Sequence, residues 1–192
     1  MSARVACAIL AAGASRRLGH PKQLTLHRGE PLVRLAAECV CQSRAAARAV
    51  VVGAYAGSVR AALGTLPVEP LPNLDWGRGI ATSIQIAGAW AEQLGCDALL
   101  LALCDQPRLT ALHLDRLIAE FSRTSLPVAS YYAHKSGVPA IFPRSLFGAL
   151  ASLDGDRGAS VLLNDGRPLS RVAWPDGEFD VDTVEAEREL AP

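Results

Sequence analysis

Residues 10–22 have the types and the spacing that a phosphate-binding loop needs. They read LAAGASRRLGHPK and continue an apolar stretch at residues 5–10, which predicts a buried strand that opens into a loop of small residues. Gly13, Ala14 and Ser15 carry little side-chain bulk, so the backbone can approach a ligand closely and turn successive N–H groups into one concavity. Two arginines and a lysine follow. Backbone donors supported by cations suit a polyanion, and a triphosphate fits this description best.

The same segment does not match other motifs that it could be confused with. It is not a Walker sequence, because only one glycine precedes a long gap and Lys22 does not directly follow Gly19. It also lacks the glycine spacing of the dinucleotide fingerprint. A signal peptide is a rival interpretation, but the apolar region is short, follows a single basic residue and runs directly into Arg16 and Arg17. We therefore interpret residues 10–22 as a ligand-binding loop.

Asp105 is the second residue that points to chemistry. It follows the apolar run at residues 98–104, which does not alternate and so predicts a strand covered on both faces, as in a parallel sheet. Ligands of open α/β sheets collect at the carboxyl ends of the strands, where we expect both Asp105 and the Gly13 loop to lie. A carboxylate there can hold Mg²⁺ against triphosphate oxygens. Backbone amides of a local turn can also satisfy such an aspartate, without any metal.

A pair of aspartates near the end of the sequence supplies another candidate ligand. Asp180 and Asp182 alternate about Val181, so in an extended segment their carboxylates share one face. The alternative is an acidic helix N-terminus, which is favourable to the helix dipole without a metal. Thr183 could cap such a helix.

Strand-like and helix-like segments alternate along the chain. This order predicts an α/β fold, a three-layer sandwich with a mostly parallel sheet, in which one strand of the less regular second half runs antiparallel. We expect residues 1–192 to form a single domain, because a chain of this length can bury one good core and shows no long linker. The expected strands are residues 5–10, 49–52, 98–104, 128–132, 138–142 and 179–181, with a brief extended segment at Val68. The expected helices are residues 31–42, 55–63, 80–93, 144–153 and, after an N-cap at Thr110, the residues up to 123.

The overall composition excludes several kinds of partner. Basic and acidic residues number 19 each, so no bulk field favours nucleic acid or an anionic membrane. No apolar run is long enough to cross a bilayer. The five cysteines lack disulfide-rich or zinc-binding spacing, which favours a reduced, cytoplasmic protein. The four histidines show no ligand spacing either, and we expect exposed or capping positions for them.

The stretch at residues 10–22 resembles the signature of the molybdenum-cofactor nucleotidyltransferases, L-A-A-G-x-S-x-R-x-G-x-x-K, and meets each fixed position. The resemblance implies a Rossmann-like nucleotidyltransferase that transfers a nucleoside monophosphate from a nucleoside triphosphate to a phosphorylated acceptor and releases pyrophosphate. It gives catalytic roles to Arg16 and Lys22. It also implies substrate binding by Leu10, Ala11, Ala12, Gly13, Ala14 and Ser15.

Two further segments resemble metal-binding motifs of this family. The sequence C-D-Q-P at residues 104–107 places Asp105 where the family has its metal aspartate, and so makes Asp105 catalytic as well. The sequence D-V-D-T at residues 180–183 resembles D-I-D-T followed by proline, in which Asp182 is the second aspartate. Val184 replaces that proline, and we expect a looser helix cap without loss of the site. The resemblance thus implies Mg²⁺, or Mn²⁺ in its place, on Asp105 and Asp182.

Three more segments match the substrate side of the family's cleft. Residues 73–84 resemble N-x-x-W-x-x-G-x-x-x-S, which lies along the base and ribose and implies contacts from Gly79 and a hydrogen bond from Ser83 to the base. A surface loop with hydroxyls that cap a helix is the ordinary alternative. Segments around Gly137 and Arg157 match the acceptor side, where Arg157 could pair with a phosphate or simply lie in a turn.

Within the family, the match is closest to the cytidylyltransferase branch, which implies CTP as donor and molybdopterin as acceptor. Ala12 supports cytidine, because the guanylyltransferase branch usually has glycine there and more room for a larger base. A molybdenum hydroxylase or its maturation factor could be a partner. Three alternatives stay open: a guanylyltransferase, a sugar-1-phosphate nucleotidyltransferase, and a non-catalytic module that binds nucleotide or cofactor as a chaperone.

Overall fold

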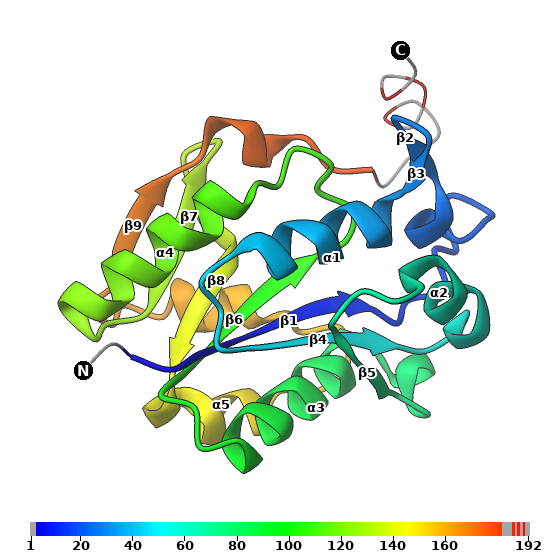
Figure 1. The fold of residues 1–192 in the computed structure, drawn as a ribbon. Coiled ribbons are helices and arrows are strands. Elements are labelled where there is room, and N and C mark those ends of the chain that lie inside the picture. The colour runs from blue at the N-terminus through cyan, green and yellow to red at the C-terminus, as the bar shows by residue number, and fades with distance from the viewer. Residues whose placement is uncertain (1–2, 182–185, 187, 189, 191–192) are drawn as a thin grey trace.

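The computed structural model describes residues 3–181 together with residues 186, 188 and 190, and it is built around a seven-stranded sheet (Figure 1). The strands of this sheet are β1 (Val5–Ala11), β4 (Ala47–Val52), β5 (Glu69–Pro72), β6 (Ala98–Leu103), β7 (Val128–Tyr132), β8 (Lys135–Pro143) and β9 (Ser170–Ala173). Their spatial order is β5-β4-β1-β6-β8-β7-β9. A separate hairpin joins β2 (Leu26–His27) to β3 (Glu30–Pro31).

β8 is the strand that departs from the parallel arrangement. β1 pairs in parallel with β4 and with β6, β4 pairs in parallel with β5, and β7 with β9. β8 is antiparallel to both of its neighbours, β6 and β7. The predicted α/β fold with a mostly parallel sheet and an antiparallel strand in the second half is confirmed. Because β1 and β6 are adjacent and parallel, the residues that follow them emerge at the same edge of the sheet.

Helices cover both faces of the sheet (Figure 1). One face carries α1 (Leu32–Gln42), α2 (Ala56–Leu63) and α4 (Ala111–Thr124), and the other carries α3 (Ile80–Gln93) and α5 (Phe147–Ala151). Side chains of β1 alternate between the two layers, with Cys7 and Ile9 in the core on the α1 side and Ala6 and Ala8 in the core on the α3 side. Covering on both faces explains why β1 is apolar throughout.

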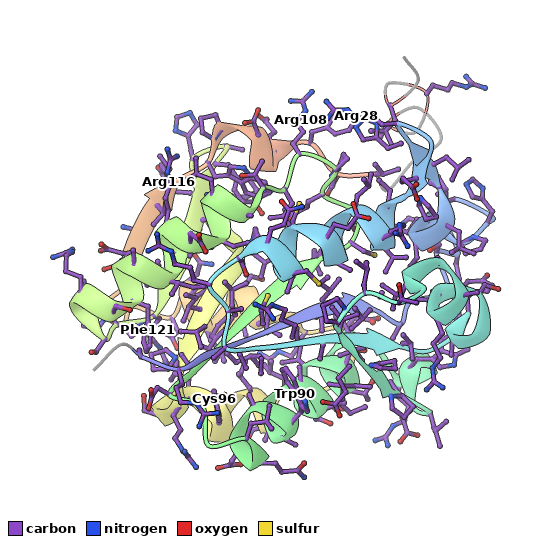
Figure 2. All side chains as sticks on the ribbon, in the orientation of Figure 1. Arg28, Trp90, Cys96, Arg108, Arg116 and Phe121 are labelled. Carbon is purple, nitrogen blue, oxygen red and sulfur yellow. The ribbon has the colours of Figure 1, made fainter. Side chains whose placement is uncertain are left out.

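Three of the side chains labelled in Figure 2 belong to the apolar layers on the two faces of the sheet. Trp90 and Cys96 lie on the α3 side, and Phe121 lies on the α4 side.

None of the helices in the described residues has the length and apolar character that crossing a membrane requires.

α4 illustrates how the local sequence produces a helix of this layer. The Thr110 side chain caps the N-terminus by accepting a hydrogen bond from the His113 amide at 3.2 Å, as predicted. Leu114, Leu117 and Phe121 then recur at helical spacing and pack against the sheet. The cap therefore sets where the helix begins, and the amphipathic pattern sets which face it buries.

Short 3₁₀ helices complete the described part of the chain. They are η1 (Lys22–Leu24), η2 (Trp76–Arg78), η3 (Arg144–Leu146), η4 (Ala159–Leu163) and η5 (Pro175–Glu178). η3 and α5 together occupy most of the helix expected at residues 144–153.

Several expected elements differ from the structure. Residues 179–181 form no strand: Phe179 has extended backbone angles, but the sheet ends at β9, an edge strand that the sequence analysis missed. β9 has only four residues, alternating between half-buried and exposed, so its apolar signal is weak. The extended segment expected at Val68 is displaced and pairs as β5 from Glu69 onward. The cap expected at Thr183 lies outside the described residues.

All five cysteines carry free thiols. Burial raises the pKa of Cys7 and of Cys104 to about 12. Since the thiolate is the reactive form, these two side chains act as small apolar groups of the core at neutral pH.

Candidate active site

A cavity of about 520 Å³ opens at the edge of the sheet where β1 and β6 end. The loop after β1, the turn that begins α3 and the end of β6 all contribute to its lining. The predicted site residues that line it are Leu10, Ala12, Gly13, Ala14, Ser15, Arg16, Lys22, Gly79, Ser83 and Asp105. The fold thus brings three segments that are distant in sequence to one cavity.

The loop after β1 turns sharply at Ser15. This residue has a left-handed backbone (φ 51°), and its carbonyl accepts hydrogen bonds from the amides of Leu18 at 3.0 Å and Gly19 at 3.2 Å. The turn leaves Arg16 and Arg17 exposed at the cavity. Guanidinium groups at the rim of a loop of small residues favour an anionic ligand.

Lys22 and Asp105 join the loop to the end of β6. Lys22 begins η1, and its Nζ atom lies 2.5 Å from Oδ2 of Asp105. The exposed fractions of the two side chains are 21% and 8%, so the pair is largely shielded from water. Shielding strengthens the attraction between the two charges and also makes either charge costly to leave alone.

Asp105 also presents an oxygen that fits a metal ion. Its Oδ1 atom is buried and finds no hydrogen-bond partner among the described residues. Such an atom is costly unless a ligand completes it, and a carboxylate oxygen is the donor that Mg²⁺ and Mn²⁺ prefer. No group of three or more His, Cys, Asp or Glu residues in the described ranges could hold a metal. A metal ion on Asp105 can take further ligands from phosphates or water.

The segment that leads to Asp182 reaches Asp105 through the backbone. The Val181 amide donates a hydrogen bond of 2.9 Å to the Asp105 carbonyl, and the Val181 side chain is fully buried. Asp182, the second predicted metal ligand, lies outside the described residues. The structure therefore describes the chain as far as Val181, the residue before Asp182, and places Val181 beside Asp105.

Asn73 organises the α3 side of the cavity. Its Nδ2 atom donates to the hydroxyls of Thr82 and Ser83, both at 2.9 Å, and its Oδ1 atom accepts from the Asp75 amide at 3.0 Å. The Asn73 side chain is buried, so these bonds hold the loop before η2 against the start of α3. Because Ser83 accepts from Asn73, its own hydrogen can point into the cavity that it lines. Half-buried Trp76 lines the same side.

The backbone at Gly79 packs directly against the loop after α5. Gly79 has φ +109°, and a Cβ there would lie 2.3 Å from the Gly155 backbone. The Ala81 amide donates to the Gly155 carbonyl at 3.1 Å. This contact brings Asp156 to the cavity lining, whereas Arg157 is exposed and does not line it. Arg157 was the residue expected to act from this loop, whereas Asp156, which reaches the cavity, was not expected to do so.

Two other predicted residues do not line the cavity. Ala11 points into the core on the α1 side. Gly137 lies on β8 against the ring of Tyr132, whose hydroxyl donates to the Val138 carbonyl at 3.1 Å. Gln106 donates to the same carbonyl at 3.2 Å, so this part of β8 is tied to the residue after Asp105.

His113 occupies a position that contradicts the expected exposed or capping role. It is buried, its ring stacks on Trp174 with the centroids 4.6 Å apart, and its Nε2 atom lies 2.7 Å from the Ser130 hydroxyl. That hydroxyl donates to the Pro139 carbonyl at 2.6 Å, so His113 must donate to Ser130 through Nε2–H. Burial, assisted by the nearby charge of Arg116, lowers the pKa of His113 to about 4. His113 is therefore neutral at physiological pH and tautomerically fixed.

Gln23, like Asp156, is a residue beside the site that was not expected from the sequence. Its side chain is 1% exposed and its amide contacts the glycine loop. Its place beside Lys22 was the available signal, but polar residues next to a charged one are commonly exposed.

Comparisons with known proteins show extensive similarity. A model of the MobA-like NTP transferase domain matches residues 7–172. Nicotine blue oxidoreductase of Paenarthrobacter nicotinovorans is 34% identical over 188 residues, which cover 92% of this chain and 91% of the relative. Purine catabolism protein PucB of Bacillus subtilis (strain 168) is 30% identical over 187 residues, which cover 92% of this chain and 90% of the relative.

Solved structures show the same relationship in three dimensions. Rv0371c of Mycobacterium tuberculosis H37Rv matches with a TM-score of 0.86 at 31% identity, covering 99% of this chain and 98% of that one. A structure of Rv0371c in complex with manganese matches with a TM-score of 0.82 at 29% identity, covering 97% of both chains. The similarity therefore extends over nearly the whole chain, the cavity included.

Proposed function

The chain belongs to the MobA-like NTP transferase family, and we propose that it transfers CMP from CTP to molybdopterin and releases pyrophosphate. Family membership establishes the reaction class, which is nucleotidyl transfer from a nucleoside triphosphate, and it confirms the family resemblance of residues 10–22. The observation that carries the proposal is the convergence of the Gly13 loop, Lys22 and Asp105 on one cavity.

The reaction needs alignment and charge neutralisation more than proton transfer. A phosphate oxygen of the acceptor is already ionised at neutral pH and attacks the α-phosphorus of the nucleotide. A new P–O bond forms as the bond to pyrophosphate breaks, and pyrophosphate leaves with the electron pair. Preorganised donors and cations lower the barrier of such a displacement, because they stabilise charge that develops on the phosphate oxygens.

The residues around the cavity divide these tasks. Amides from Ala12 to Ser15 orient the triphosphate, and Arg16 and Lys22 neutralise its charge. A Mg²⁺ or Mn²⁺ ion held by Asp105 and Asp182 would supply further neutralisation on the phosphates and on the leaving pyrophosphate. The buried, unpartnered Oδ1 of Asp105 supports this assignment, as does the manganese complex of Rv0371c.

Base selection falls to the two walls of the nucleotide side. Ser83, held by Asn73, donates a hydrogen bond to the base, while Gly79 lets the backbone approach the ribose. Ala12 restricts the opposite wall. It packs closely against the loop after β4, where a Cβ added to Gly53 would lie 2.7 Å from the Cβ of Ala12. A cytosine requires less room than a guanine, which favours CTP.

The acceptor side is assigned to residues beyond the cavity. We place Gly137 and Arg157 there, with Arg157 as the partner of an acceptor phosphate. A molybdenum hydroxylase or its maturation factor would receive the product.

Pyrophosphate release from each of the four ribonucleoside triphosphates, with molybdopterin as acceptor, tests this proposal. We expect the highest kcat/KM with CTP, and equal values for CTP and GTP would remove the base assignment. The variant Asp105→Ala should release no pyrophosphate while keeping its fold. Undiminished release by that variant would exclude the role given to Asp105, and absence of release from the wild type would leave a non-catalytic carrier.

A further inference from the structure

Gln23 is among the largest side chains that the structure buries completely, and it is an amide. Its Nε2 atom donates to the Ala11 carbonyl at 3.0 Å and to the Gly13 carbonyl at 2.6 Å. Its Oε1 atom accepts from the Ser15 hydroxyl at 3.3 Å. Both N–H hydrogens and the oxygen of this amide therefore form hydrogen bonds with the same loop.

These bonds determine which way the loop amides face. In a planar trans peptide the carbonyl and the following N–H point in opposite directions. Because the carbonyls of Ala11 and Gly13 point toward Gln23, the N–H groups of Ala12 and Ala14 point away from it. The Gln23 amide thus sets the orientation of two peptide planes in the loop.

The carbonyls of Ala12 and Ala14, which alternate with these two, are also held by the protein. The Ala12 carbonyl accepts from the Ala54 amide at 3.0 Å, and the Ala14 carbonyl accepts from the Tyr55 hydroxyl at 3.3 Å. Four successive carbonyls are therefore anchored. The N–H groups of residues 13–15 donate to no acceptor within the part of the chain that the structure describes, and these residues line the cavity. The loop thus presents to the cavity a set of donors that an anionic ligand can use.

The same amide is coupled to the cation of the site. The Ser15 hydroxyl, which donates to Gln23, accepts from the Lys22 amide at 3.1 Å. Ser15 is also the residue with the left-handed backbone, a conformation that needs surrounding contacts to hold it. One buried side chain therefore connects the loop carbonyls, the strained turn and the start of η1.

We propose that Gln23 is a positioning residue. It holds the loop at residues 11–15 with its amides facing the triphosphate and, through Ser15, keeps Lys22 in place beside them. The inference rests on the proposed function, because it assigns this orientation a purpose in binding the nucleotide. It adds a residue that touches no substrate and acts through the loop.

Affinity for magnesium tripolyphosphate, measured by isothermal titration calorimetry, isolates the loop from base recognition. Gln23→Met keeps the length of the side chain and removes all three hydrogen bonds. Gln23→Glu keeps an acceptor for Ser15 and removes the two donors, so it serves where the first variant does not fold. We expect either folded variant to bind about 10- to 100-fold more weakly than the wild type. The KM for CTP should rise in the same proportion, and the KM for the acceptor should not change.

Gln85→Met is the matched control. Gln85 also donates to two carbonyls, those of Ala151 at 3.3 Å and Leu153 at 2.7 Å. Its loss should lower the midpoint of thermal unfolding without weakening tripolyphosphate binding. A folded Gln23 variant that binds within twofold of the wild type overturns the inference alone. A wild type that neither binds tripolyphosphate nor releases pyrophosphate overturns the proposed function, and the inference with it.

Discussion

The ammonium of Lys22 lies 2.5 Å from a carboxylate oxygen of Asp105, although 83 positions separate them in the sequence. The lysine comes from the glycine loop after β1, and the aspartate follows the neighbouring strand β6. The pair therefore joins the cation and the carboxylate to which we assign roles in the proposed nucleotidyl transfer. It is also largely buried, so each partner depends on the other.

Replacement of the carboxylate should slow the reaction strongly without unfolding the protein. Asp105→Asn keeps the side-chain shape but removes the negative charge that suits a metal ion. We expect kcat for pyrophosphate release to fall by about 10²–10³-fold, the loss typical for a preorganised electrostatic group. Circular dichroism should show an unchanged fold, and a kcat within tenfold of the wild type would contradict the assignment.

Removal of the cation should destabilise the fold. Lys22→Met leaves the Asp105 carboxylate buried without its partner, and we expect the free energy of unfolding in urea to fall by about 1–3 kcal/mol. The double variant Lys22→Met, Asp105→Asn contains no unpaired charge. It should therefore lose about 1 kcal/mol less than the sum of the single losses, and strict additivity would show that the pair contributes no coupling.

Gly79→Ala should disturb both stability and substrate binding. The new Cβ would stand 2.3 Å from the Gly155 backbone, at a φ that alanine rarely adopts. We expect a loss of about 2–3 kcal/mol in unfolding free energy and a higher KM for the nucleotide, because the clash shifts the Gly79 backbone that we place along the ribose.

Gly88→Ala in the same helix is the control for this change. A Cβ there meets nothing within 4 Å, so the variant should gain about 0.5–1 kcal/mol from helix propensity and keep its KM. Equal behaviour of the two variants in thermal and kinetic measurements would refute the close packing at Gly79.

His113 should make the protein acid-sensitive. Burial lowers its pKa from 6.5 to about 4, so between these values the unfolded chain binds a proton that the folded protein does not. The stability due to neutral His113 is fully present above about pH 6.5 and is lost as the pH falls toward 4, by up to roughly 3 kcal/mol. His113→Phe keeps an aromatic ring against Trp174 but cannot titrate. As the pH is lowered, the unfolding free energy of the wild type should therefore fall relative to that of the variant. A difference between the two that does not vary with pH would rule out this titration.

Ala12→Gly should broaden base selection. Loss of this methyl group makes room on the wall of the cavity, and we expect the ratio of kcat/KM for GTP to that for CTP to rise about tenfold. Ala11→Gly is the matched change, since Ala11 points into the opposite core and should leave that ratio unaltered. Both variants should be assayed in parallel. An equal change of the ratio in both would show that base selection does not depend on Ala12.

The sequence by itself determined the local features of this protein. α3 and β7 begin and end where their apolar spacing predicts, because periodicity is a property of consecutive residues. The family signature at residues 10–22 could also be recognised in the sequence, since it depends only on residue types and their spacing along the chain. β9 and the segment at residues 179–181 were not, because short, partly exposed segments have no comparable signal.

Only the tertiary structure decided which of these features meet. The ion pair of Lys22 with Asp105, the burial of Gln23 beneath its loop and the contact of Gly79 with Gly155 each join segments far apart in sequence. Such partners follow from the order of the strands and from which side chains the two layers of helices enclose. Both depend on the free energy of the whole core, which no local pattern contains.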